Sequence, residues 1–148
     1  MFPTFSEAVL AVVLFASAVC STTAYARPSA TINAGVVVGT ATSVPSSTNT
    51  VNQFLGIPFA APPIRFAPPV PPKPWTKPFQ ANKNAPSCIQ QFPNELIESL
   101  VNNPPPEAGE SEDCLYINVY APASPAPKEG RTVMFWLYGG DLLCGHNS

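Results

Sequence analysis

Near the end of the sequence, Thr132–Tyr138 (T-V-M-F-W-L-Y) is almost entirely apolar and shows no alternation with polar residues. Strands that are buried on both faces of a parallel or mixed sheet have this pattern, whereas half-exposed strands alternate. The stretch is therefore predicted to be a buried strand. Gly139, Gly140 and Asp141 follow it directly, which predicts a tight turn at the end of the strand.

Three shorter patterns predict further strands. Gly35–Thr40 is a β-branched run bounded by glycine, and Val51–Ile57 alternates well enough to be its antiparallel partner. Ala41–Asn49, rich in Ser, Thr and Pro, is predicted to be the connecting turn or loop. Pro58 should end the second strand, because proline cannot donate to a ladder. Cys114–Tyr120 is the third predicted strand.

Pro62–Pro78 is a proline belt (P-P-I-R-F-A-P-P-V-P-P-K-P-W-T-K-P). This composition favours polyproline II or an irregular wrap that needs few hydrogen-bond partners, held against a core by Phe66 and Trp75. A docking ligand for an SH3- or WW-type domain is the alternative, which is disfavoured because those partners are intracellular.

One segment has a helical pattern. Asn94–Val101 places its apolar residues on one face, and Asn94 can cap the start. Asn102–Gly109 contains three consecutive prolines and ends the helix, and Ala121–Gly130 is predicted to be a loop rich in proline and alanine.

The first 26 residues have the pattern of a secretory signal peptide. Ala8–Cys20 is a continuous run of small and apolar residues, and Ala24-Tyr25-Ala26 fits an A-x-A cleavage site. The alternatives are a membrane anchor or a core helix, but the run is shorter than the about 20 apolar residues of a spanning helix. We therefore expect removal of residues 1–26, no membrane span, and a secreted extracellular product that begins at Arg27.

The composition and net charge of the chain disfavour some classes of binding partner. The 148 residues suffice for one small domain, and their formal net charge is −2. This charge disfavours nucleic acid and anionic membrane surfaces as partners. The 20 prolines are far above average usage and favour extended segments and turns over long helices.

Secretion changes the interpretation of the cysteines. Cys20 would leave with the signal peptide, and two of Cys88, Cys114 and Cys144 are expected to pair in an oxidising compartment. Cys88 and Cys114 are favoured because each lies beside Pro-rich or polar loop sequence, and closing the loop between them is worth roughly 3 kcal/mol. Cys144 is then expected to be a small buried residue. The only histidine, His146, is too close in sequence to activate Cys144 as a nucleophile.

Three stretches, in order and at similar spacing, resemble the type-B carboxylesterase family, which includes cholinesterases and fungal extracellular lipases. They are Phe54–Pro63 followed by Arg65–Pro69, then Ser111–Pro122, then Val133–Gly140, and the resemblance covers nearly all of Gly35–Ser148. It implies an α/β class, as the N-terminal portion of an α/β-hydrolase that is mostly strands and Pro-rich loops here with an incomplete central sheet. Residues 27–148 would be the truncated domain of a secreted, fungal-type member.

The resemblance implies two structural pairs. Cys88 and Cys114 match a family disulfide, and Arg65 and Glu112 match a family salt bridge. If that salt bridge were buried, removing one partner would cost about 3–5 kcal/mol. If it were exposed, it would contribute at most about 1 kcal/mol.

The resemblance also assigns a role to the glycine turn. Relatives place three glycines after this strand and use the N–H groups of the second and third as an oxyanion hole. Gly139 and Gly140 match the first two, whereas Asp141 replaces the third. The Asp141 N–H is still a possible donor, because it belongs to the backbone.

The remaining catalytic residues of the family have no match. Its nucleophile lies in a G-x-S-x-G turn, followed by the acid and the histidine. Gly35 and Gly39 are the only glycines at that spacing and flank three valines, and His146 comes too early. We therefore assign no nucleophile, acid or base to this chain, and we expect no metal and no cofactor.

Two functions remain open. The first is an N-terminal fragment of a secreted carboxylic ester hydrolase, inactive by itself because it lacks the catalytic triad, whose full-length relative acts on an ester or lipid substrate. The second is a secreted non-catalytic protein, binding or structural, derived from the same fold. The sequence predicts no partner protein and no nucleic acid in either case.

Overall fold

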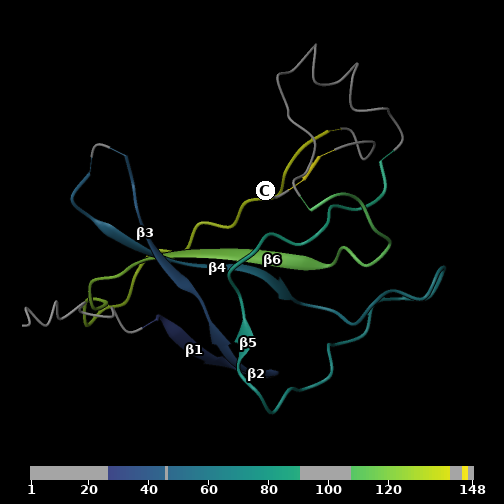
Figure 1. The fold of residues 1–148 in the computed structure, drawn as a ribbon, viewed down its shortest axis with the longest axis horizontal. Helices are drawn as coiled ribbons and strands as arrows, with labels where there is room; N and C mark the ends of the chain where they lie inside the picture. The colour runs from purple at the N-terminus through teal and green to yellow at the C-terminus, as the bar shows by residue number, and fades with distance from the viewer. Residues whose placement is uncertain (1–26, 46, 91–107, 141–144, 147–148) are drawn as a thin grey trace, which may run out of the picture.

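The computed structural model describes residues 27–45, 47–90, 108–140 and 145–146. These residues form two three-stranded sheets and no α-helix, with strand orders β1-β2-β5 and β3-β4-β6 (Figure 1). The predicted signal peptide, the predicted helix Asn94–Val101, and the residues Asp141 and Cys144 lie outside the described ranges. The strands are β1 Ser29–Ile32, β2 Gly35–Val38, β3 Thr40–Ser43, β4 Thr50–Pro58, β5 Phe79–Gln80 and β6 Tyr116–Pro122.

The predicted strand Gly35–Thr40 is divided at Gly39, where the chain passes from one sheet to the other. β2 pairs antiparallel with β1, and β3 pairs antiparallel with β4, so that Thr40 lies opposite Gln53. A Cβ atom at Gly39 would lie 2.8 Å from the ring of Phe54, so only glycine fits at this crossing. The predicted pairing with Val51–Ile57 is therefore wrong for β2, and the loop predicted from Ala41 begins only after β3.

The predicted strands Val51–Ile57 and Cys114–Tyr120 are confirmed as β4 and β6, with shifted ends. β4 ends at Pro58 as expected, and β6 continues to Pro122. The two strands pair antiparallel along the centre of the molecule, with a register shift between Phe54 and Ile57 (Figure 1). Gly56 lies in this bulge with φ +66°, and its N–H donates to Asn118 Oδ1 at 2.8 Å.

A small core lies between the two sheets. Ala81, directly after β5, is fully buried, its N–H donates to Val38 O and its carbonyl accepts from Leu55 N. The segment therefore joins β2 to β4 with main-chain hydrogen bonds. The buried members of the core are Val37, Phe54, Ile57 and Ala81, with Trp75, Phe79 and Ile117 packed against them.

The proline belt is irregular, as predicted, and only one of its two expected anchors holds. Trp75 packs against the core, and its Nε1 donates to Val36 O at 2.8 Å. Gly35 permits this approach, because a Cβ there would lie 2.6 Å from the indole. Phe66, in contrast, is 98% exposed, so the prediction that it holds the belt against the core is wrong.

The predicted buried strand Thr132–Tyr138 does not form in the described structure. The segment has no regular secondary structure, and Val133–Leu137 are each between 72% and 93% exposed. Its composition suits a strand with neighbours on both sides, and no described segment pairs with it. The prediction was wrong because apolar composition alone cannot supply the hydrogen-bonded neighbours.

This exposed segment predicts poor solubility for the 148-residue chain produced on its own, because an open apolar stretch invites association. Replacing Met134 and Trp136 together with Glu should raise the soluble yield several-fold, measured as the fraction left in the supernatant after centrifugation. The matched control is Thr42→Glu/Ser43→Glu, which adds the same charge at exposed polar positions. Equal gains from both pairs would show that charge alone, and not this segment, limits solubility.

Candidate functional site

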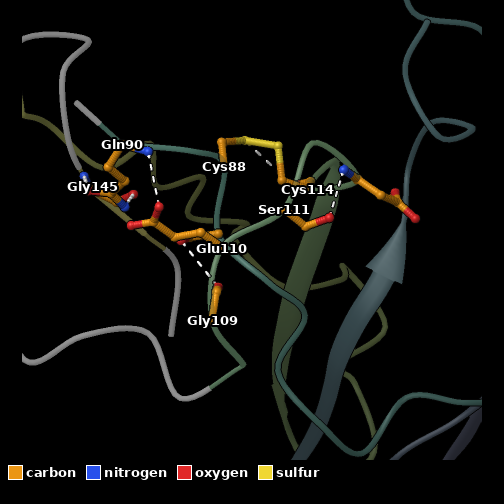
Figure 2. Close-up of a disulfide and its surroundings, with 9 residues drawn as sticks. Cys88, Gln90, Gly109, Glu110, Ser111, Cys114 and Gly145 are labelled. Carbon is orange, nitrogen blue, oxygen red and sulfur yellow. Dashed lines mark hydrogen bonds between the residues drawn. A yellow bond between two sulfur atoms is a disulfide. The ribbon is translucent and has the colours of Figure 1, made fainter.

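A disulfide joins two loops beside the start of β6. Cys88 and Cys114 are joined, with their Cα atoms 4.9 Å apart, as predicted (Figure 2). Ser87, the residue before Cys88, is buried. Its N–H donates to Gly109 O at 3.0 Å, and its carbonyl accepts from Ser111 N at 2.8 Å. The covalent bond and these main-chain bonds hold the two loops parallel over several residues.

Gln90 extends from this frame toward the glycine-rich end of the chain. Its side-chain Nε2 donates to Gly145 O at 2.9 Å, and its Oε1 accepts from Gly145 N at 3.0 Å. Its own backbone N–H donates to Glu110 Oε2 at 3.4 Å, a weaker bond drawn in Figure 2. Both polar atoms of the Gln90 amide therefore bind the backbone of a residue 55 positions away.

The glycine turn that follows Thr132–Tyr138 requires glycine at two described positions. Gly140 has φ +115° and Gly145 has φ +128°, both in the region that L side chains rarely adopt. A Cβ at Gly145 would lie 2.5 Å from Tyr138 Cδ2 and 2.7 Å from Gly139 O. Gly145 therefore packs directly on the start of the turn.

The structure forms the ion pair between Arg65 and Glu112, through Arg65 Nη2 and Glu112 Oε1. The two side chains are 68% and 62% exposed. Water therefore screens the pair, and the expectation for a buried pair does not apply.

Removing this ion pair should change stability little. Arg65→Ala and Glu112→Ala are each expected to lower the free energy of unfolding by at most about 1 kcal/mol, measured by urea denaturation. The double variant should match the single variants in 1 M salt, where exposed charges are screened. A loss above about 2 kcal/mol that persists in high salt would contradict this.

Asp113 and Tyr116 form a second polar contact close to the disulfide. Burial raises the pKa of the Tyr116 hydroxyl, and the hydrogen bond and negative charge of Asp113 raise it further. Asp113 N also donates to Ser111 Oγ at 3.1 Å. The Tyr116 hydroxyl at the start of β6 therefore keeps its proton to a higher pH than a free tyrosine does.

The structure thus brings together Cys88 with Cys114, and Arg65 with Glu112. Gly139 and Gly140 lie at the turn that Gly145 closes, whereas Asp141 lies outside the described residues. Within the described ranges, no group of three metal-ligating side chains is present, and no helix has the length and apolar character to cross a membrane. Sequence reasoning missed Gln90, because a glutamine two residues after a cysteine carries no local pattern that reveals a distant partner.

Comparisons of sequence and structure find similar known proteins. The sequence model of the carboxylesterase family matches residues 26–148. Acetylcholinesterase of Electrophorus electricus is 42% identical over 121 residues, which are 77% of this chain and 18% of that protein. Carboxylesterase 1E of Mus musculus is 40% identical over 119 residues, which are 75% of this chain and 21% of that protein.

The solved structure of a PNB esterase is similar as well, with a TM-score of 0.52 and 35% identity over 68% of this chain and 19% of that one. The chain thus spans about a fifth of the length of the proteins it matches. Its fold class is α/β, as the N-terminal portion of an α/β-hydrolase with an incomplete sheet. Because the family model matches residues 26–148, well over half of the sequence, the chain belongs to the carboxylesterase family.

Proposed function

We propose that this chain is the N-terminal, oxyanion-binding part of a secreted carboxylic ester hydrolase. One observation carries the proposal: directly after the apolar segment, Gly140 adopts a φ of +115° that favours glycine, inside a sequence that belongs to the carboxylesterase family. A glycine in this conformation can present its backbone N–H to a small ligand at close approach.

The proposed chemistry is acyl transfer from a carboxylic ester. Nucleophilic attack places negative charge on the carbonyl oxygen, and preorganised backbone N–H groups stabilise that charge. The N–H groups of Gly140 and Asp141 are the proposed donors. Each such donor is worth about 10²–10³ in rate. The nucleophile, acid and base of the reaction are not assigned to residues of this chain.

Asp141 sets a condition on this role. A carboxylate at about 5 Å from the oxyanion would oppose it by about 3 kcal/mol at an effective dielectric constant of about 20. The proposal therefore requires the Asp141 side chain to be directed away from the carbonyl oxygen. Asp141→Gly, which removes the carboxylate and keeps the N–H, should then leave the rate unchanged within about threefold.

The test is a chimera in which residues 27–148 replace the matching segment of mouse carboxylesterase 1E. Hydrolysis of a p-nitrophenyl ester by the chimera is the expected result. Gly140→Val should lower kcat by about 10²–10³, with KM within about threefold, because valine cannot keep the N–H in place.

Gly130→Val is the matched control, since Gly130 also has a positive φ of +85° and has open space around it. This substitution introduces backbone strain of the same kind away from the turn and should leave kcat within about threefold. Equal losses from Gly130→Val and Gly140→Val, or a folded chimera without activity, would overturn the proposal.

The 148-residue chain by itself is proposed to be inactive, because its sequence contains no G-x-S-x-G. Ester turnover by the purified chain that a serine-directed phosphonate abolishes would refute this.

Secretion is part of the proposal, and the disulfide supports it because such bonds persist in oxidising compartments. Expression with residues 1–26 present should yield a product in the medium that begins at Arg27, as read by N-terminal mass spectrometry. An intact N-terminus on a product retained in the cell would contradict it.

A further inference from the structure

We propose that Gln90 is a positioning residue that fixes the glycine turn to the disulfide frame and so orients the Gly140 N–H. The first observation is the pair of hydrogen bonds at 2.9 and 3.0 Å between the Gln90 amide and the backbone of Gly145. The donor and the acceptor of one side-chain amide thus bind the carbonyl and the N–H of one residue. This arrangement fixes the orientation of Gly145 as well as its distance, which a single bond cannot do.

The frame behind Gln90 is itself constrained. Two residues earlier, Cys88 is bonded to Cys114, and Ser87 forms an isolated parallel bridge with Glu110. Glu110 also accepts the backbone N–H of Gln90 through its carboxylate. Figure 2 shows Gln90 between Glu110 and Gly145 on the side of the disulfide where these two loops meet. The side chain therefore projects from a cross-linked support.

Gly145, the partner of Gln90, contacts the glycine turn. Gly145 packs so closely on Tyr138 and Gly139 that even a methyl group would have to displace them. Gly140 follows Gly139 directly, so the position of Gly145 limits where the peptide group that carries the Gly140 N–H can lie. A chain of contacts thus runs from the disulfide through Gln90 and Gly145 to the turn.

This inference rests on the proposed function, in which the Gly140 N–H is an oxyanion donor. It adds that the donor is oriented by a side chain from a loop 50 residues earlier in the sequence. Gln90 touches neither the ester nor a reacting atom in this proposal and acts only through Gly145.

The test is hydrogen exchange, read at single-residue resolution by mass spectrometry on the oxidised 148-residue chain in the Met134→Glu/Trp136→Glu background, which should keep it in solution. Gln90→Ala removes both hydrogen bonds and should speed exchange of the Gly145 amide by about tenfold or more and change that of Gly140 by about threefold. Gln90→Glu keeps an acceptor for the Gly145 N–H, but it replaces the donor Nε2 with an oxygen that repels Gly145 O. Exchange of the Gly145 amide in this variant should therefore lie between that of the parent and that of Gln90→Ala. Gln80→Ala, which removes an exposed glutamine bonded to Arg27, is the matched control and should change neither amide.

Each outcome decides the proposal. An unchanged exchange rate of the Gly145 amide in Gln90→Ala would show that Gln90 does not hold Gly145. A faster Gly145 amide with an unchanged Gly140 amide would show that Gln90 does not affect the proposed donor. If Gln90→Ala does not form the Cys88–Cys114 bond, Gln90→Met serves in its place, because it keeps the length of the side chain and removes both amide groups. Unchanged exchange at Gly145 in Gln90→Met would then overturn the proposal.

Kinetics in the chimera separate this inference from the proposed function. Gln90→Ala should lower kcat about tenfold with KM within about twofold, and Gln90→Glu should restore part of it. If Gln90→Ala changes the exchange rate of the Gly140 amide but Gly140→Val leaves kcat unchanged, the oxyanion role of Gly140 fails while the positioning role of Gln90 is retained. If Gly140→Val lowers kcat but Gln90→Ala does not, the function stands and the positioning role fails.

Discussion

Phe54→Ala is expected to destabilise the folded chain by about 3–5 kcal/mol, the range for removing a large side chain from a core. Phe54 is 8% exposed and lies with Val37, Ile57 and Ala81 between the two sheets. This core is small, so few neighbours can move to fill the cavity. Because small domains have total stabilities of about 5–15 kcal/mol, the variant should lose most of its cooperative unfolding transition.

Phe66→Ala is the matched control for this experiment. It makes the same chemical change at a side chain that is 98% exposed, and it leaves a non-glycine residue at a φ of +66°. The expected change is within about 0.5 kcal/mol. The free energy of unfolding should be measured by urea denaturation in the Met134→Glu/Trp136→Glu background, which keeps the chain in solution. Equal losses from the two phenylalanine variants would contradict the assignment of the core.

Removing the disulfide is the second large effect. Replacing Cys88 and Cys114 together with Ser should lower the free energy of unfolding by roughly 3 kcal/mol in the chain-entropy model, because the unfolded chain gains the freedom that the closed loop denies it. The midpoint of urea unfolding should fall, and its slope should rise, because the unfolded chain without the cross-link is more expanded. The amides of Ser87 and Ser111, which form the parallel bridge beside the disulfide, should also exchange faster with solvent. The reason is that the disulfide no longer holds the two loops together.

Cys144→Ser controls for the loss of a thiol. It should leave both the stability and the Cys88–Cys114 bond unchanged, as read by peptide mapping under non-reducing conditions. A wild-type map in which Cys144 is bonded to either of the other two cysteines would contradict the pairing in the structure.

Sequence reasoning succeeded where local chemistry decides the outcome. β4 and β6 have enough alternation to be recognised, Pro58 marks an end that no neighbour can override, and the cysteine pairing follows from the flanking loops and the family resemblance. The belt that carries Trp75 is irregular because its prolines exclude regular hydrogen bonding.

It failed where distant parts of the molecule decide the outcome. Gly39 divides one predicted strand because the Phe54 ring occupies the space beside it, which no local pattern reveals. The two residues of β5 have no periodicity and are ordered by their bonds to other strands. Thr132–Tyr138 has the composition of a central strand, but its geometry depends on neighbours that the described residues do not include. The Gln90–Gly145 contact likewise joins positions that are unrelated in sequence.

The main-chain hydrogen bonds of Ala81 couple the unfolding of the two sheets. Ala81 donates to Val38 in one sheet and accepts from Leu55 in the other, and neither bond depends on a side chain. The two sheets are therefore expected to melt together as one foldon, because opening either one exposes the same buried peptide group. A protease that nicks the proline belt between β4 and β5 would then cut the covalent chain without separating the two halves.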